Sequence, residues 1–200
     1  MDYQKPISKI YSYKNVSIIA KSNNFQVELI KKISSSDLKD LVKTSKDLVE
    51  VFGEDAILNN NNINKYFNEK TLPFIARYNK TIIGYIIGVP LEKFNNESWA
   101  HFDINLNKFN TLYTYAFVIQ KKFRKKTGYS KTLKKIYINW AKKRGFKYIT
   151  GHVKKQVSEK FKNTEIIKTF NVWYDCNEPF NYYRRKIWFL QIVIYFIFSI

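Results

Sequence analysis

The chain has 200 residues, of which 45% are hydrophobic and 18% aromatic, and its formal net charge is +19. This composition excludes a disordered chain and is sufficient for one folded domain. With Cys176 as its only cysteine, the sequence excludes a disulfide framework and a cysteine-based zinc site, and we expect no structural metal. The first residues lack the apolar run of a secretory signal, so we expect a reducing, cytoplasmic location.

The expected elements alternate between strands and helices along one domain. We expect a lead-in over residues 1–24, containing a first strand, a folded domain over 25–187 and an apolar tail over 188–200. In chain order, the elements are strands at 16–20 and 25–33, helices at about 34–53 and 61–69, strands at 73–78 and 81–89, a polar loop with an edge strand over 91–110, a strand at 111–120, a helix at about 128–144, a strand at 146–153, a helix at 158–168, and strands near 169–174 and 180–187. This order predicts a mixed α/β domain around one central sheet.

Local signals mark several of these boundaries. Ser34 to Ser36 offer an N-cap, and Asp37 follows in the first turn, where an acid is favourable. Gly53 ends the apolar stripe of that helix. The two-residue segment Asn79-Lys80 between β-rich runs predicts a hairpin.

The helix over 128–144 has the clearest pattern in the chain. Apolar side chains recur at positions i, i+3, i+4, i+7 and i+8, which predicts one buried stripe: Leu133, Ile136, Tyr137, Trp140 and Ala141. Basic residues fill its last turn, and Gly145 can adopt the positive φ that ends a helix. The chain thus predicts a strand, a basic turn containing Gly128, and the start of a helix, which is an arrangement able to hold a phosphate.

The positive charge is concentrated in the same region. Residues 111–160 contain 15 Lys and Arg and one acid, whereas residues 1–110 contain 15 basic and 12 acidic residues. We therefore expect an anionic partner for the central stretch, which leaves nucleic acid, an anionic membrane and a phosphorylated cofactor as candidates.

The element order and the turn together resemble the GCN5-related N-acetyltransferase (GNAT) superfamily. The family signature Q/R-x-x-G-x-G/A is similar to Lys125-Lys126-Thr127-Gly128-Tyr129-Ser130, in which Lys125 replaces Gln or Arg and Ser130 replaces the second small residue. The paired strands RYNKTIIGYIIG also look like the β-hairpin of the family. The resemblance spans about residues 25–187 and implies a mixed, mostly antiparallel central sheet with helices on both faces.

The resemblance also implies how acetyl-CoA would be bound. The coenzyme A pyrophosphate would lie against the backbone of residues 125–130, with the basic side chains of Lys125, Lys126 and Lys131 at the rim. The strand before the turn would separate from its neighbour at a bulge, and Phe117, Val118 and Ile119 would pair through their backbone with the pantetheine arm.

Acetyl transfer further requires a neutral amine and a proton for the departing thiolate. The strand over 111–120 contains no Asp or Glu, so no general base carries over from the family. The candidate catalytic residues are Tyr115 on this strand, His152 as a base, and Tyr182 as the thiolate acid, with the adjacent Tyr183 as an alternative. For His152, Tyr182 and Tyr183, a purely structural role is the competing interpretation.

The tail over 188–200, WFLQIVIYFIFSI, has no charged residue and follows Arg184-Arg185-Lys186. As a helix it would be about 20 Å long, which is shorter than the roughly 30 Å of a bilayer core. An added strand, a covering helix, a homodimer contact or insertion into a membrane surface remain open for it.

Two functions from different classes follow. The first is an N-acetyltransferase that transfers the acetyl group of acetyl-CoA to an amine on a small molecule or a protein, directly in a ternary complex. The second is a non-enzymatic module that uses the basic face over 121–160 to bind nucleic acid or an anionic membrane.

Overall fold

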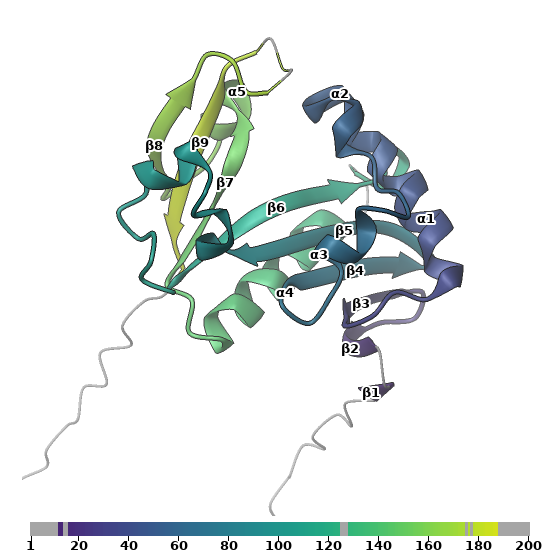
Figure 1. The fold of residues 1–200 in the computed structure, drawn as a ribbon. Helices are drawn as coiled ribbons and strands as arrows, with labels where there is room; N and C mark the ends of the chain where they lie inside the picture. The colour runs from purple at the N-terminus through teal and green to yellow at the C-terminus, as the bar shows by residue number, and fades with distance from the viewer. Residues whose placement is uncertain (1–11, 14–15, 125–127, 175, 177, 188–200) are drawn as a thin grey trace, which may run out of the picture.

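The computed structural model describes residues 12–13, 16–124, 128–174, 176 and 178–187 (Figure 1). Over these residues, nine strands form one sheet in the order β1-β2-β3-β4-β5-β6-β7-β9-β8. The strands are β1 (Ser12–Tyr13), β2 (Val16–Lys21), β3 (Phe25–Ile30), β4 (Leu72–Tyr78), β5 (Thr81–Pro90), β6 (Thr111–Ile119), β7 (Tyr148–Lys154), β8 (Glu165–Phe170) and β9 (Phe180–Lys186). Neighbouring strands are antiparallel except β6 and β7, which run parallel. This confirms the mixed, mostly antiparallel α/β fold.

Helices cover both faces of the sheet (Figure 1). On one face, Tyr137 packs edge-on against Phe74 of β4, with ring centroids 6.2 Å apart. On the other face, Leu41 and Ile63 are buried in one cluster with Ile75, the next residue of β4. The helices are α1 (Ser35–Ser45), α2 (Val49–Phe52), α3 (Ile63–Tyr66), α4 (Tyr129–Lys143) and α5 (Lys155–Ser158), and the 3₁₀ turns are η1 (Lys46–Leu48), η2 (Glu54–Ala56), η3 (Leu91–Phe94), η4 (Ser98–Phe102) and η5 (Lys121–Phe123).

The boundary signals read from the sequence are largely confirmed. The Ser34 hydroxyl accepts a hydrogen bond from the Asp37 N–H (3.3 Å) and caps α1, although the helix is then interrupted by η1 before α2 ends at Gly53. Asn79 and Lys80 both have positive φ (48° and 69°), as a tight two-residue hairpin between β4 and β5 requires.

Two predicted elements are wrong. The helix expected over 158–168 is a single turn, α5, after which the chain turns at Asn163 with φ 54° and enters β8, four residues earlier than the expected strand near 169–174. The β-branched Ile166 and Ile167 fit a strand, which here pairs with β9. Residues 91–110 contain η3 and η4 instead of an edge strand.

The structure describes part of the expected N-terminal lead-in but not the C-terminal tail. β2, within the expected lead-in over 1–24, pairs with β3 and extends the sheet. The apolar tail over 188–200 lies outside the described residues, so its role stays a prediction. Within the described ranges, no helix combines the length and the apolar character needed to cross a membrane.

Gly84 allows β5 and β6 to approach closely. A Cβ at this position would lie 2.5 Å from the Val118 carbonyl oxygen and would also meet the Ile119 side chain. We therefore expect Gly84→Ala to lower the free energy of unfolding by about 1–3 kcal/mol, measured by urea denaturation. Thr81→Ala, at the exposed end of the same strand, is the control and should change it by less than about 0.5 kcal/mol. Equal stability of the two variants would contradict this close approach.

Candidate functional site

The strands β6 and β7 separate part-way along their length. Their pairing covers only Thr111–Tyr113 of β6 and Tyr148–Thr150 of β7. Beyond this point the two strands diverge, and β7 continues with β9 away from the rest of the sheet (Figure 1). From Thr114 onward, one edge of β6 therefore has no neighbouring strand among the described residues, and its backbone groups are available to a ligand.

A β-bulge lies where the strands separate. Thr114 is opposite Gly88 and Ala116 is opposite Ile87, so Tyr115 is the extra residue of β6. A bulge bends its strand and changes the direction of the local side chains. Both the separation and the bulge were expected in the strand before the basic turn, and the structure locates the bulge at Tyr115.

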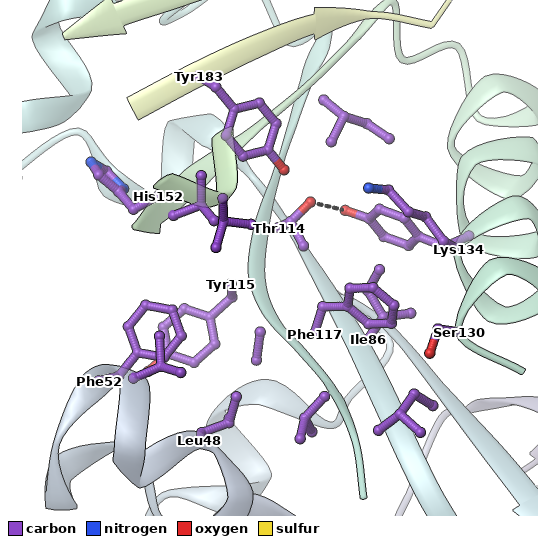
Figure 2. Close-up of a pocket in the computed structure, with 18 of the residues that line it drawn as sticks. Leu48, Phe52, Ile86, Thr114, Tyr115, Phe117, Ser130, Lys134, His152 and Tyr183 are labelled. Atoms are coloured by element: carbon purple, nitrogen blue, oxygen red, sulfur yellow. Dashed lines mark hydrogen bonds between the residues drawn. The ribbon is translucent and has the colours of Figure 1, made fainter. Parts of the chain in front are cut away.

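A cavity of about 390 Å³ fills the opening between β6 and β7 (Figure 2). Phe117, Val118 and Ile119, the expected pantetheine strand, lie along its wall. Most of the remaining lining comes from both sides of the sheet. From the α1–α2 side come Asp47, Leu48, Val51 and Phe52, from α4 come Ser130, Lys134, Tyr137 and Ile138, and from the segments after β6 come Ile149, His152, Val153, Val157, Phe161, Tyr183 and Arg185.

The first residues of α4 border this cavity. Gly128 is the N-cap of the helix with φ 70°, a left-handed conformation that favours glycine, and its carbonyl accepts a hydrogen bond from the Thr132 N–H (3.0 Å). Ser130 lines the cavity, whereas Lys131 lines an adjoining hollow. Tyr129 stacks on Phe25 with ring centroids 4.4 Å apart, which indicates a packing role.

The expected cradle residues Lys125, Lys126 and Thr127 lie outside the described residues, so their role in cofactor binding stays a prediction.

Tyr115 lies on the α1–α2 side of the cavity. Its ring stacks on that of Tyr66 at 4.0 Å, and its hydroxyl donates a hydrogen bond to the Tyr66 hydroxyl (2.7 Å). Burial, followed by the hydrogen bond to Tyr66, raises the pKa of Tyr115. The hydroxyl of Tyr115 therefore keeps its proton at neutral pH. Phe52 and Leu48 lie near Tyr115 along the same wall of the cavity (Figure 2).

The two adjacent tyrosines of β9 lie on opposite faces of the sheet. Tyr182 is fully buried outside the cavity lining, where its hydroxyl donates to Asp103 Oδ2 (3.1 Å). Tyr183 lines the cavity, and Figure 2 shows its hydroxyl directed toward Thr114. Burial raises the pKa of Tyr183, so it holds its proton at neutral pH. The structure thus brings Tyr183, and not the first candidate Tyr182, to the opening between the strands.

His152 borders the cavity but belongs to a buried aromatic cluster. Its ring stacks on Trp173 (3.4 Å between centroids) and on Tyr182 (4.8 Å), and its Nδ1 is 3.0 Å from the Tyr113 hydroxyl. Burial lowers the pKa of His152 to about 2. The expectation that His152 has a pKa suited to a general base is therefore wrong, because desolvation strongly disfavours its charged form.

This burial predicts a specific loss of stability in mild acid. The folded-state pKa of His152, about 2, lies below its ordinary value of 6.5, so the unfolded chain binds a proton that the folded chain does not. The resulting stability is complete above pH 6.5 and is lost as the pH falls, by about 2 kcal/mol between pH 7 and pH 5. His152→Phe should remove this dependence, as measured by urea denaturation at both pH values. An identical pH dependence in the variant and the parent would contradict the buried neutral state.

Asp47 is the one carboxylate among the described residues that line the cavity. Its Oδ2 accepts a hydrogen bond from the Lys121 N–H (2.8 Å) and lies 3.8 Å from Arg124 Nη2. Asp47 therefore connects η1 to the segment after β6.

The site offers protonated tyrosines, a free strand edge and a helix N-terminus, which can bind an extended anionic ligand and supply a proton.

Sequence reasoning offered Tyr183 only as the alternative to Tyr182, and it missed two other lining residues that the fold brings to the cavity, Lys134 and Phe52. What selects Tyr183 over Tyr182 is the pairing of β7 with β9, in which Tyr183 lies opposite Gly151 and Tyr182 lies opposite His152. Only the register of these two strands distinguishes the faces on which the tyrosines lie.

Comparisons with known proteins agree with this geometry. The sequence profile of the Acetyltransferase (GNAT) family matches residues 39–160, more than half of the chain. A search of curated proteins gives no match. Among solved structures, yncA from Salmonella typhimurium, described as a putative acetyltransferase with its cofactor acetyl-CoA, has a TM-score of 0.62 at 10% identity and covers 84% of this chain and 96% of that chain.

Two further structures show the same fold. Ard1 from Thermoplasma volcanium has a TM-score of 0.60 at 10% identity, with coverage of 84% of this chain and 100% of that chain. The ribosomal-protein-S18-alanine N-acetyltransferase from Escherichia coli has a TM-score of 0.56 at 12% identity, with coverage of 86% and 99%. At such identities these structures establish the fold, and the profile match establishes the family. The chain belongs to the GNAT family of acetyltransferases, which use acetyl-CoA as acetyl donor.

Proposed function

We propose that this protein is an N-acetyltransferase that transfers the acetyl group of acetyl-CoA directly to an amine, with both substrates bound at once. The observation that carries this proposal is the opening between β6 and β7, which holds a cavity lined from both sides of the sheet. One side can hold acetyl-CoA along Phe117 to Ile119, with its pyrophosphate toward the N-terminus of α4. The α1–α2 side is then left for the amine.

In the proposed reaction, the neutral amine attacks the thioester carbonyl, and the C–S bond breaks as the C–N bond forms. Tyr183 donates its hydroxyl proton to the departing thiolate sulfur and is reprotonated by the proton that the amine nitrogen loses. We assign the base to neither His152, whose pKa is lowered by burial, nor Asp47, which is engaged by Lys121 and Arg124. The amine is therefore proposed to lose its first proton to solvent before it binds.

The walls on the amine side favour an acceptor with an apolar or aromatic group beside its nitrogen. Leu48, Phe52 and Tyr115, whose ring stacks on Tyr66, present mostly carbon surface there. The names of the structural neighbours include a ribosomal-protein-alanine N-acetyltransferase and an aminoglycoside 6'-acetyltransferase, so protein amines and small-molecule amines both belong in a substrate panel.

The test begins with calorimetry of acetyl-CoA binding at physiological salt. It continues with an assay of free thiol release over peptide N-termini, lysine peptides, aromatic amines and aminoglycosides. We expect binding, and thiol release that depends on one acceptor class. Absence of acetyl-CoA binding would overturn the proposal. If duplex DNA binds with a steep salt dependence and acetyl-CoA does not compete, the basic face serves a binding module instead.

A further inference from the structure

An exposed aromatic side chain is held in a strained backbone conformation in the loop between η4 and β6. Phe109 is 76% exposed and has φ 52°, which is in the left-handed region. This region is unfavourable for a residue with a bulky side chain, and exposure gives the ring no packing in return. The Phe109 N–H donates a hydrogen bond to Glu92 Oε1 (2.8 Å), which helps to hold the loop in place. A strained residue with an exposed ring points to binding more than to packing.

Three segments of the chain meet beside this loop. The Lys147 N–H donates to the carbonyl of Asn110 (2.7 Å), the residue after Phe109, and the Ile187 N–H donates to the Lys147 carbonyl (2.9 Å). The loop, the end of α4 with the segment after it, and the end of β9 therefore lie at one corner of the molecule (Figure 1). We call this surface the basic corner and define it by residues 107–110, 143–147 and 186–187.

Basic side chains share this corner with Phe109. Five of them are exposed: Lys108, Lys143, Arg144, Lys147 and Lys186. The ion pairs found among the described residues involve none of these five. The corner thus combines positive charge with an exposed aromatic ring, and proteins use this combination to bind the surface of anionic membranes.

The chain also leaves the described part of the fold at this corner. Ile187 is buried in the core cluster that contains Leu112 and Tyr137. The segment that follows it, 188–200, lies outside the described residues, and its sequence is mostly apolar with no charged residue. Reversible membrane binding becomes stable when an apolar segment and a basic cluster act together, and the sequence joins the two here.

We propose that the basic corner docks on an anionic membrane surface, with Phe109 inserted among the lipid headgroups and the segment over 188–200 entering the same surface. Contact between two copies of the corner would bring like charges together. Nucleic acid would neutralise the cations but leave the apolar segment exposed to water. An anionic bilayer satisfies both the charge and the apolar surface. This inference goes beyond the proposed acetyl transfer and does not depend on it.

The test is sedimentation of the full chain with lipid vesicles. One set of vesicles is phosphatidylcholine alone, and the other contains about 30% phosphatidylserine. We expect the partition coefficient to be at least about tenfold higher for the anionic vesicles, because several basic residues lie near the charged surface. This difference should shrink as salt is added, since salt screens exposed charges.

Phe109→Gly tests the insertion of the aromatic ring. It should weaken binding to the anionic vesicles by about tenfold, because it removes the apolar side chain. It should not lower the thermal unfolding temperature, since glycine adopts this φ without strain. Tyr174→Gly is the matched control, because Tyr174 is also exposed (67%), has φ 48° and precedes the opposite end of β9. The control should bind vesicles within about twofold of the parent.

The basic side chains are tested at constant net charge. The double variant Lys143→Gln with Lys147→Gln should weaken vesicle binding by about tenfold or more. Its control, Lys39→Gln with Lys43→Gln, removes two exposed lysines from α1 and should change binding by less than about twofold. A local effect of the corner is thereby distinguished from an effect of the total charge.

The outcomes decide the inference without reference to acetyl-CoA, whose binding is measured separately. Absence of binding to anionic vesicles overturns it. If the Phe109 variant and the double lysine variant bind vesicles as their controls do, the membrane contacts another surface and the assignment is wrong. If Phe109→Gly instead converts a dimer into a monomer with vesicle binding unchanged, the corner is a contact between copies. If the double lysine variant loses duplex DNA binding and not vesicle binding, the corner serves nucleic acid. Each of the last two results also overturns the membrane assignment.

Discussion

Replacing Gly128 with valine is expected to weaken acetyl-CoA binding by about a hundredfold, which corresponds to about 2.7 kcal/mol. Gly128 is the N-cap of α4 and has φ 70°, where a side chain with a Cβ is strained by about 1–2 kcal/mol. A valine favours negative φ, and relaxation toward it would turn the first peptide N–H groups of α4 away from a bound pyrophosphate. Calorimetry with acetyl-CoA measures the loss.

The same helix supplies a matched control. Gly145 follows the C-terminal end of α4 with φ 84°. Apart from the adjacent residues in the chain, no atom of the described residues lies within 4 Å of the position a Cβ would take at either glycine. Gly145→Val should therefore lower the thermal unfolding temperature about as much as Gly128→Val, because both introduce the same backbone strain. Only the Gly128 variant should lose cofactor affinity. Equal affinities in the two variants would refute the placement of the pyrophosphate at the N-terminus of α4.

Tyr183→Phe is expected to lower kcat by about 10²- to 10⁴-fold, the usual contribution of a positioned proton donor. Tyr183 borders the opening where the thioester is proposed to lie, and its raised pKa keeps it protonated. Phenylalanine preserves the ring and removes only the hydroxyl, so acetyl-CoA affinity should change by less than about threefold. Thiol release under saturating substrates, combined with calorimetry, separates the two effects.

The neighbouring tyrosine provides the comparison. Tyr182→Phe removes the hydrogen bond to Asp103, which keeps its ion pair with Arg184 (2.7 Å). We expect this variant to lose about 1–2 kcal/mol of stability and to retain kcat within about threefold. If Tyr182→Phe abolishes turnover while Tyr183→Phe does not, the roles of the two residues are reversed and the mechanism proposed for Tyr183 is wrong.

The sequence predicted those parts of the fold that depend on local periodicity. The stripe of α4 and the hairpin at Asn79-Lys80 follow directly from spacing and turn chemistry, and the structure confirms both. Gly128 could also be found from sequence, since it is the only glycine between the strand at 111–120 and the helix that follows. These signals were sufficient to suggest the end of the site at which a phosphate is proposed to bind.

The remaining parts depended on contacts between distant segments. Glu165 to Phe170 forms β8 because β9 is available to pair with it, whereas the local pattern over 158–168 was compatible with a helix. The burial of His152 depends on Trp99, which comes from η4, and on Trp173, which follows β8. The pattern around His152 itself gives no sign of these partners, so its neutral state could not be predicted from the sequence.

The free edge of β6 also bears on how the protein behaves without its acetyl donor. From Thr114 to Ile119, this edge lacks a strand partner among the described residues, and unpaired strand edges promote association between chains. A bound ligand that covers the edge would both block such association and stabilise the fold by mass action, by about 2.7 kcal/mol at a hundredfold excess over Kd. Acetyl-CoA bound along this edge is therefore expected to lower both the unfolded fraction and the self-association of the protein.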